Sequence, residues 1–183
     1  QQLITSDLDY GIPMQKMGYS TTFIPNPINT DKIVFQPIEN TNKIIIFLGI
    51  NRLSYLKKGI NYFEKALEII REKYADKVEI IVTENLPYNE YISIYNKAHI
   101  LLDQVFAYDQ GYNALEAMAK GKVVFTGAET EFLNQYQLQE DEVCINALPN
   151  ETEIAAKLSL LIEHPEKIIE ISRNARNFIE KEH

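Results

Sequence analysis

The sequence of 183 residues carries 18 Lys and Arg against 26 Asp and Glu, which gives a formal net charge of −8. A chain of this length forms one domain with its own core, and 45% hydrophobic with 24% charged residues is a globular rather than a disordered composition. Nucleic-acid binding is not expected, because phosphate neutralisation requires clustered Lys and Arg and no basic tract is present.

Short segments exclude two further classes of protein. The longest apolar run, residues 44–50, is far shorter than the ~20 residues that a membrane-spanning helix requires. The chain begins with Gln-Gln and mixed polar residues, so no secretory signal is expected. Cys144 is the single cysteine and cannot form an internal disulfide, which favours a reducing, cytoplasmic location.

The first forty residues differ in pattern from the rest of the chain. Residues 24–29, Ile-Pro-Asn-Pro-Ile-Asn, form a proline-punctuated stretch that cannot be helical and that is typical of a linker. From residue 43 onward, short apolar runs alternate with longer stretches of helical period. This alternation predicts βαβ units and a parallel sheet.

Strands and helices are expected in turn along this second part. The expected strands are residues 43–49, 78–83, 99–105, 123–126 and 142–147. The expected helices are residues 60–74, a helix beginning at Pro87, residues 111–120, and two final helices separated at His164 and Pro165. The pattern predicts an α/β fold, a Rossmann-like three-layer domain with a parallel sheet flanked by helices.

Several common catalytic motifs cannot be built from this sequence. The seven glycines, at positions 11, 18, 49, 59, 111, 121 and 127, form neither a G-x-G-x-x-G fingerprint nor a Walker A loop. No Ser lies in a G-x-S-x-G turn, and neither Cys144 nor the His residues have metal-ligand spacing. Residues 7–9, Asp-Leu-Asp, formally match a D-x-D motif but lie outside the βα part, so we expect no metal site there.

Two cations follow the first strand of the βα part. Gly49 ends that strand, and the loop over residues 50–58 carries Arg52 and Lys58. Ligands of doubly wound folds bind at the carboxyl ends of strands, so two cations beside helix-start N–H groups suit an anion such as a diphosphate. The alternative is that they are solvated loop charges. Residues 83–87 leave the second strand at the same edge and either contact a planar ring or form an ordinary βα turn.

A third segment, residues 111–119, places Glu116 one turn into a short helix behind Gly111. A carboxylate there can accept two hydrogen bonds from a diol such as ribose, while helix-start N–H groups face a phosphate. The alternative is a plain helix in which Glu116 favours the positive end of the helix dipole and its apolar neighbours belong to the core.

The order and spacing of these segments resemble one family. The matching landmarks are the linker 24–29, the strand and loop 47–59, the helix end 94–98 and, most specifically, residues 115–124, Leu-Glu-Ala-Met-Ala-Lys-Gly-Lys-Val-Val. With these the chain resembles the C-terminal, nucleotide-sugar donor-binding domain of a family-four retaining glycosyltransferase of the GT-B fold. The resemblance runs from about residue 21 to the end of the chain.

This resemblance implies a domain organisation. Residues 1–20 would be the remnant of a preceding N-terminal domain or a linker segment, since residues 6–17 are similar to the closing segment of that domain in the family. Residues 21–183 would be the Rossmann-like donor-binding domain, one half of a GT-B fold. The acceptor-binding N-terminal domain would be missing, and the chain would stop before a last helix that crosses back.

The resemblance also implies roles for particular residues. Arg52, Lys58 and Glu116 would be the catalytic residues: the two cations hold the diphosphate and stabilise its charge as it leaves, and Glu116 binds the ribose hydroxyls. The other donor-binding residues would be those whose backbone meets a phosphate or that lie against the base, namely Gly111, Tyr112, Asn113, Ala114 and Leu115, and Glu84 and Asn85 in the segment 84–88. Transfer would retain anomeric configuration and need no metal or cofactor beside a UDP- or GDP-linked sugar.

The sequence departs from the family pattern in three places. The family has a carboxylate eight positions before the one at Glu116, where this chain has Tyr108; Asp109 could substitute by a shift of one residue. The segment 78–95 is short and lacks a strand that many relatives have. His99 stands where Asp is common, and we expect it to be a hydrogen-bonded residue at a strand start rather than a catalyst.

The expected function is that of a donor-binding domain for transfer of a sugar to a glycan or lipid-linked acceptor in polysaccharide biosynthesis. The full-length protein would be a hexosyltransferase in the cytoplasm, also at the inner face of the membrane, with peripheral membrane contact through the missing domain; this chain alone would be inactive. Two alternatives stay open. One is a GT-B-fold nucleotide-sugar epimerase with the same diphosphate site, and the other is a degenerate domain used for partner docking, which the missing first carboxylate favours.

Overall fold

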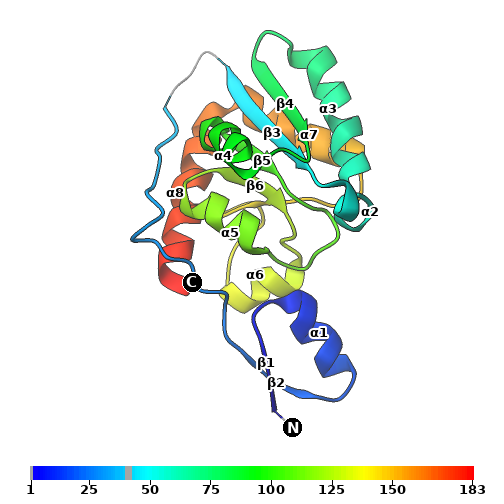
Figure 1. The fold of residues 1–183 in the computed structure, drawn as a ribbon, viewed down its shortest axis with the longest axis vertical. Helices are drawn as coiled ribbons and strands as arrows, with labels where there is room; N and C mark the ends of the chain where they lie inside the picture. The colour runs from blue at the N-terminus through cyan, green and yellow to red at the C-terminus, as the bar shows by residue number, and fades with distance from the viewer. Residues whose placement is uncertain (1, 40–42) are drawn as a thin grey trace.

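The computed structural model describes residues 2–39 and 43–183, with the side chain of Tyr88 outside that description (Figure 1). Five parallel strands form one sheet in the order β4-β3-β5-β6-β7. They are β3 (Ile44–Ile50), β4 (Val78–Glu84), β5 (Ile100–Leu102), β6 (Val123–Thr126) and β7 (Ile145–Asn146). The predicted parallel sheet is confirmed, although β5 and β7 are shorter than the predicted runs 99–105 and 142–147.

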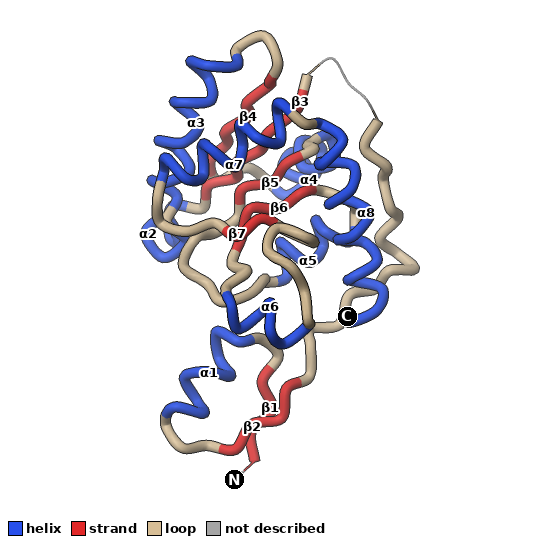
Figure 2. The backbone as a smooth tube through the Cα atoms, turned by 180° about the vertical axis from the view of Figure 1, so that it is seen from behind, coloured by secondary structure: helices blue, strands red, loops and turns tan. Residues whose placement is uncertain are grey.

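Helices cover both faces of this sheet, as a Rossmann-like three-layer domain requires (Figures 1 and 2). Helices α3 and α7 pack on one face and α4 and α5 on the other, while α8 contributes residues to both packed layers. Their bounds are α2 (Tyr55–Lys58), α3 (Ile60–Tyr74), α4 (Tyr88–Lys97), α5 (Tyr112–Ala119), α6 (Thr130–Tyr136), α7 (Glu151–Glu163) and α8 (Pro165–Glu182). In the described part of the chain, no helix combines the length and apolar character needed to cross a bilayer.

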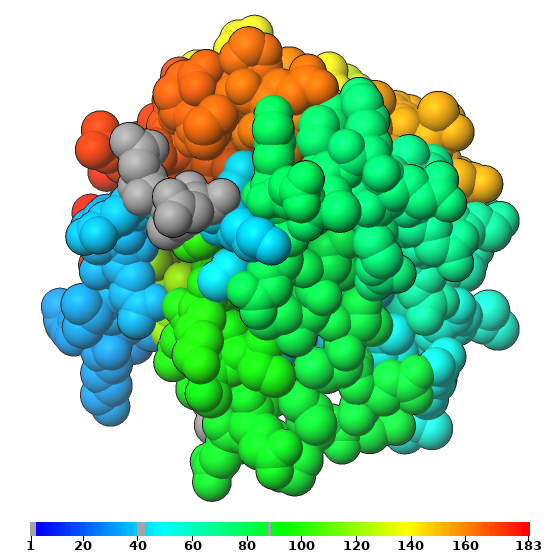
Figure 3. Space-filling model, turned by 90° about the horizontal axis from the view of Figure 1, so that it is seen from above, coloured from blue at the N-terminus to red at the C-terminus, as the bar shows by residue number. Residues whose placement is uncertain are grey.

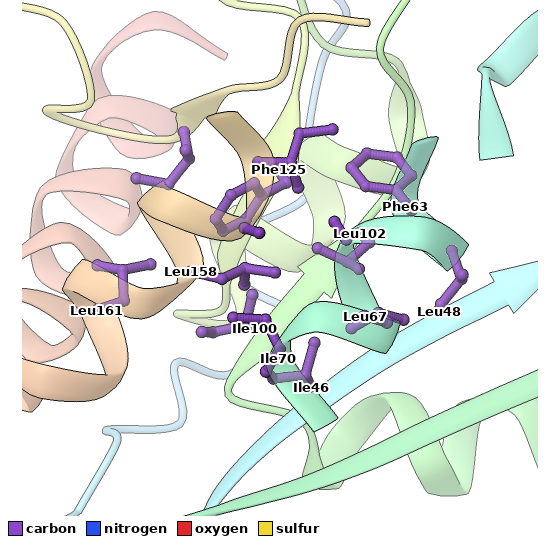
Figure 4. Packing of buried hydrophobic residues seen from close by; sticks show 14 of the residues in the cluster. Ile46, Leu48, Phe63, Leu67, Ile70, Ile100, Leu102, Phe125, Leu158 and Leu161 are labelled. Atoms are coloured by element: carbon purple, nitrogen blue, oxygen red, sulfur yellow. The ribbon is translucent and has the colours of Figure 1, made fainter. Parts of the chain in front are cut away.

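The core lies on the two faces of β3, because successive strand residues point to opposite sides. Ile46 and Leu48 are fully buried against α3 and α7, where Phe63 and Leu158 close the layer (Figure 4). Phe47 points the other way, into the layer formed by α4 and α5. Burying each of these side chains contributes about 1.5–3 kcal/mol, so the strand that ends at the site is held from both faces.

The first residues form a small βαβ unit that sequence analysis did not resolve. Strand β1 (Gln2–Thr5) pairs in parallel with β2 (Ser20–Phe23), and α1 (Leu8–Lys16) connects them. The Asp7 side chain accepts a hydrogen bond from Tyr10 N at 3.0 Å and caps α1. The predicted domain boundary between residues 20 and 21 falls inside β2.

The predicted non-helical stretch at 24–29 is confirmed, and it continues as an extended strap over residues 24–39. The strap lies along α8 (Figures 1 and 2), and Figure 3 shows its blue atoms on the surface at the left, below the red atoms of the C-terminal part of the chain. Arg176 of α8 donates to the backbone oxygens of Ile33 at 2.7 Å and Thr30 at 3.3 Å, and Ile28 N donates to His183 O at 3.0 Å. The strap is therefore fixed to the domain by backbone groups.

Candidate functional site

The order of strands reverses between β3 and β5, and a cavity of about 270 Å³ opens at their carboxyl ends. This is the position at which doubly wound folds bind ligands. The cavity is lined by Gly49, Ile50, Asn51, Lys58, Thr83, Asn85, Leu86, Tyr91, Leu102, Asp103 and Asn113. Other cavities, of about 280 Å³ beside α7 and α8 and about 390 Å³ between α1 and α6, lie away from this edge.

Lys58 reaches the cavity because of the turn that follows it. Gly59 has φ +64, a left-handed conformation that L side chains rarely adopt, and an added Cβ would lie 2.2 Å from Val105. The turn makes Lys58 the last residue of α2, and its carbonyl oxygen accepts a hydrogen bond from Val105 N at 3.0 Å. The Lys58 Nζ then lies 2.8 Å from Oδ1 of Asp103, whose side chain is only 3% exposed.

Asp103 lies directly after β5 and is the buried centre of a polar network. Its Oδ1 also accepts a hydrogen bond from Asn113 Nδ2 at 3.0 Å, and its Oδ2 accepts one from Thr126 Oγ1 at 3.4 Å. The Tyr91 hydroxyl donates to Asn113 Oδ1 at 3.0 Å. Burial, aided by the charge of Asp103, raises the pKa of Tyr91 to about 12, so this hydroxyl keeps its proton at neutral pH.

The amino end of α5 faces the same network. Gly111 caps the helix without a side-chain hydrogen bond, and the first intrahelical bond runs from Leu115 N to Gly111 O at 3.0 Å. The amides of residues 112–114 precede that bond and have no partner inside the helix. The side chains of Ala114 and Leu115 are buried in the core, so only the backbone of these two residues can meet a ligand. The predicted amide of Leu115 is already engaged within the helix.

Arg52 lies beside the cavity rather than in its lining. The pairing of β3 with β4 aligns Ile50 with Glu84, and Arg52 Nε donates to Glu84 Oε2 at 2.9 Å. Both side chains are about half exposed, at 49% and 46%. The hydrogen bond and the opposite charge raise the pKa of Arg52 and lower that of Glu84, so the pair is fully ionised at neutral pH. Two predicted donor-binding residues thus contact each other.

The remaining predicted side chains divide between the cavity and the surface. Asn85 lines the cavity with φ +46, a conformation that Asn tolerates better than most residues, and its N–H donates to Ile50 O at 3.0 Å. Glu116 is exposed on α5 and is not part of the lining. Within residues 2–39 and 43–183, its carboxylate makes no ion pair. It is therefore available to a ligand lying across the start of α5.

The two candidates for a first carboxylate both lie at the contact with α1. Asp109 Oδ2 accepts a hydrogen bond from Leu8 N at 2.8 Å, and Tyr108 N donates to Asp9 Oδ1 at 2.7 Å. Burial raises the pKa of Asp109 to about 7. Neither Tyr108 nor Asp109 lines the cavity. Both residues join the small βαβ unit to the larger domain.

His99 is a structural residue, as expected. Its Nδ1 accepts a hydrogen bond from Ile45 N at 3.0 Å, and burial lowers its pKa, so the ring is neutral at pH 7. Among the side chains that the structure describes, no three His, Cys, Asp or Glu gather in a way that could hold a metal ion.

Sequence analysis missed Asp103 and Tyr91 as members of the site, whereas Thr83 belongs to the segment 83–87 that was expected there. The signal for Asp103 was present, since an acidic residue that ends a wholly apolar strand, as in Ile-Leu-Leu-Asp, is placed by topology at the ligand-binding edge of the sheet. Tyr91 lies in the helix that was expected to begin at Pro87, and only the fold shows that its hydroxyl reaches Asn113.

Comparison with known proteins identifies the family. Residues 53–183 match the model of a glycosyl transferase-like family. Among proteins of curated function, none matches the sequence.

The fold is similar to that of solved glycosyltransferases. The C-terminal domain of LpcC, a group 1 glycosyl transferase of Francisella tularensis, is 21% identical, with a TM-score of 0.59 over 84% of this chain and 97% of that domain. TarM of S. aureus, in complex with fondaparinux, α-GlcNAc-glycerol and UDP, is 16% identical, with a TM-score of 0.68 over 100% of this chain and 41% of its own. The pneumococcal O-GlcNAc transferase GtfA, in complex with UDP and GlcNAc, is 12% identical, with a TM-score of 0.68 over 99% of this chain and 42% of its own.

The chain therefore belongs to the glycosyl transferase-like family, and its fold is that of the C-terminal domain of a GT-B glycosyltransferase. It spans less than half of the length of TarM and of GtfA.

Proposed function

We propose that this chain binds a nucleoside diphosphate-sugar as the donor-binding domain of a glycosyltransferase. The observation that carries the proposal is the meeting of Lys58, Asp103 and the start of α5, whose first amides have no partner inside that helix, at one cavity where the strand order reverses. A cation beside helix-start amides is an anion site, and a diphosphate is the anion that a sugar donor presents. Two similar proteins, TarM and GtfA, are in complex with UDP.

Each group has a defined part in this proposal. Lys58 keeps N–H donors beyond the one directed at Asp103, and with the α5 amides it binds the diphosphate and stabilises its charge during departure. Arg52 is the second cation and exchanges Glu84 for a phosphate oxygen. Glu116 accepts hydrogen bonds from the ribose diol. Asn85 and the neighbouring backbone lie against the base.

The reaction that we propose is transfer of a hexose from UDP or GDP to a glycan or lipid-linked acceptor, with retention of anomeric configuration and without a metal. The acceptor would be bound by a domain outside this chain, since the similar TarM and GtfA chains are more than twice as long as the part that aligns. This chain alone would then bind donor and transfer nothing. The complete enzyme would act in the cytoplasm, in polysaccharide biosynthesis, at or near the inner face of the membrane.

Calorimetric titration with UDP, GDP and ADP tests the donor site. Lys58→Gln and Glu116→Gln should each lower the affinity for the best nucleotide about tenfold or more, since a charged hydrogen bond contributes about 1.5–3 kcal/mol. Lys157→Gln is the matched control, because Lys157 also pairs with a carboxylate, Asp141 at 3.0 Å, but lies beside α7 and α8. Absence of nucleotide binding at millimolar concentration would overturn the proposal and favour the docking domain, and interconversion of free nucleotide-sugars would favour the epimerase.

A further inference from the structure

We propose that Asp103 is a positioning residue that fixes Lys58 and the start of α5 in the geometry that a diphosphate requires. The inference rests on the proposed function, and it assigns a role to a buried side chain that the donor-site residues do not include. Asp103 is 4% exposed and belongs to the lining of the cavity. It acts through its neighbours and need not touch the ligand.

The contacts of the carboxylate join three parts of the chain that end at the same edge. Its Oδ1 accepts from Lys58 Nζ, on the segment that follows β3, at 2.8 Å, and from Asn113 Nδ2, at the start of α5, at 3.0 Å. Its Oδ2 lies 3.4 Å from Thr126 Oγ1, at the end of β6. The backbone is fixed as well, because Asp103 N donates to Phe125 O at 2.9 Å. One buried group therefore sets the distance between the cation and the helix start.

This arrangement orients the Lys58 side chain but adds no net charge to the site. The charges of Lys58 and Asp103 compensate each other before any ligand enters, so attraction of a diphosphate from a distance is weak. A lysine side chain in solvent has many rotamers, and holding it in one of them removes that entropy loss from the binding step. Asn113 is held from both sides, since its Oδ1 also accepts from the Tyr91 hydroxyl at 3.0 Å. The amides of α5 are thereby aimed at the same point as Lys58.

Two other buried polar groups, the Thr5 hydroxyl and the Lys122 ammonium group, are not open to a ligand. The cavity of about 390 Å³ between α1 and α6 includes Thr5, whose hydroxyl is unpaired among the described residues, but that oxygen is packed against Gly11 and closed to the cavity. Lys122 is 4% exposed with a pKa lowered to about 8 by burial, but its Nζ is used by Asn96 O at 2.7 Å and Gln36 Oε1 at 3.3 Å.

The test compares Asp103→Asn with the wild-type chain for three kinds of ligand: the best-binding nucleoside diphosphate, its free nucleoside and inorganic pyrophosphate. Affinity for the diphosphate and for pyrophosphate should fall about tenfold or more, while affinity for the nucleoside should change less than about twofold. In a Lys58→Gln background the same substitution should have a smaller further effect, because only the contact of Asp103 with the start of α5 remains to be lost. Asp141→Asn is the matched control, since it removes a carboxylate from the Lys157 pair elsewhere.

Equal losses for the diphosphate and the nucleoside would mean a general structural role and would overturn the inference, as would unchanged pyrophosphate binding. If Asp103→Asn does not fold, Asn113→Ser provides the same comparison, since it keeps the ion pair of Lys58 with Asp103 and removes the hydrogen bonds that join Asn113 to Asp103 and to the Tyr91 hydroxyl. It should weaken pyrophosphate binding and spare the nucleoside.

If the proposed function is wrong, the result is different: the wild-type chain binds none of UDP, GDP and ADP, and no pyrophosphate. Positioning is then measured in the free chain, as solvent exchange of the Asn113 side-chain amide by NMR. Asp103→Asn should accelerate that exchange about tenfold, since a neutral amide is a weaker acceptor than a carboxylate. An unchanged exchange rate would show that Asp103 positions nothing.

Discussion

Arg52 and Glu84 bind each other at the carboxyl ends of two neighbouring strands, with Nε of Arg52 2.9 Å from Oε2 of Glu84. The guanidinium carbon also lies 5.1 Å from the centre of the Tyr55 ring, so the side chain is stacked as well as paired. Half-exposed ion pairs of this kind are weak, because solvent screens the two charges. In the proposed donor site a phosphate oxygen would therefore compete with Glu84 for the guanidinium, and the ion pair would oppose donor binding.

The first prediction follows from this competition. Glu84→Gln should raise the affinity for a nucleoside diphosphate about two- to fivefold, because Arg52 no longer has to leave a carboxylate. Arg52→Gln should lower the same affinity. Calorimetry measures both, with Glu151→Gln as a control for the change in net charge, since Glu151 pairs with Lys65 at 3.5 Å away from the cavity. A loss of affinity in Glu84→Gln would mean that Glu84 itself contacts the donor, as sequence analysis predicted.

The second prediction concerns pH and the contact between α1 and the domain. Burial, together with the charges of Asp7 and Asp9, raises the pKa of Asp109 from an ordinary 3.8 to about 7, although the hydrogen bond from the Leu8 amide opposes the shift. At a pH between these two pKa values, the Asp109 carboxyl group binds more protons in the folded chain than in the unfolded chain. Its contribution to the free energy of unfolding therefore falls as the pH rises.

Asp109→Asn removes this dependence. Relative to wild type, the variant should gain about 2–4 kcal/mol in the free energy of unfolding between pH 4 and pH 8. Urea denaturation at several pH values measures the difference. Burial also raises the pKa of Asp9, although the charge of Lys57 opposes that shift. The free energy of unfolding of the variant therefore keeps a smaller slope against pH. A constant difference between the two chains across this range would contradict the prediction.

The third prediction concerns the single thiol. Cys144 is 1% exposed, and burial raises the pKa of its thiol, so the reactive thiolate is scarce in the folded chain. Native labelling with a disulfide reagent at pH 8 should be at least about a thousandfold slower than labelling in urea, because the site must open first. Rapid labelling of the folded chain would show that the core around β7 opens easily.

The sheet and its flanking helices could be predicted from the sequence because each element carries a local pattern. The run Ile-Ile-Ile-Phe-Leu before Gly49 can only be a buried strand, and the apolar spacing over residues 60–74 fits only a helix. The sequence pattern did not predict the small βαβ unit, because β1 and β2 have four residues each and pair only with each other. Their stability depends on contacts such as that of Leu8 with Asp109.

The location of the site could be predicted from the sequence, but its side-chain contacts could not. Strand ends and helix starts fix which segments meet, and that was sufficient to bring Lys58, Asn85 and residues 111–113 to one edge. The pairing of Arg52 with Glu84 depends on the register of β3 against β4, and the burial of Asp103 depends on how deep β5 lies between its neighbours. Neither the register of β3 against β4 nor the depth of β5 can be predicted from a local sequence pattern.

The last prediction concerns the strap, which has little secondary structure of its own and is held in part by one side chain of α8. Arg176 is 14% exposed, and its guanidinium donates to Ile33 O at 2.7 Å, Ala119 O at 2.9 Å and Thr30 O at 3.3 Å. A planar fork with several donors can satisfy three carbonyl groups at once, whereas an ammonium group on a longer stem cannot match that geometry.

Arg176→Ala should therefore lower the free energy of unfolding by about 2–4 kcal/mol, because three buried or half-buried carbonyl groups lose a charged donor. Arg176→Lys should recover less than half of that loss. Arg173→Ala is the matched control on the same helix, since Arg173 is exposed and should cost about 0.5 kcal/mol or less. Equal effects of the two alanine substitutions in urea denaturation would mean that the strap is held by its apolar contacts, such as that of Ile28 with the core, rather than by Arg176.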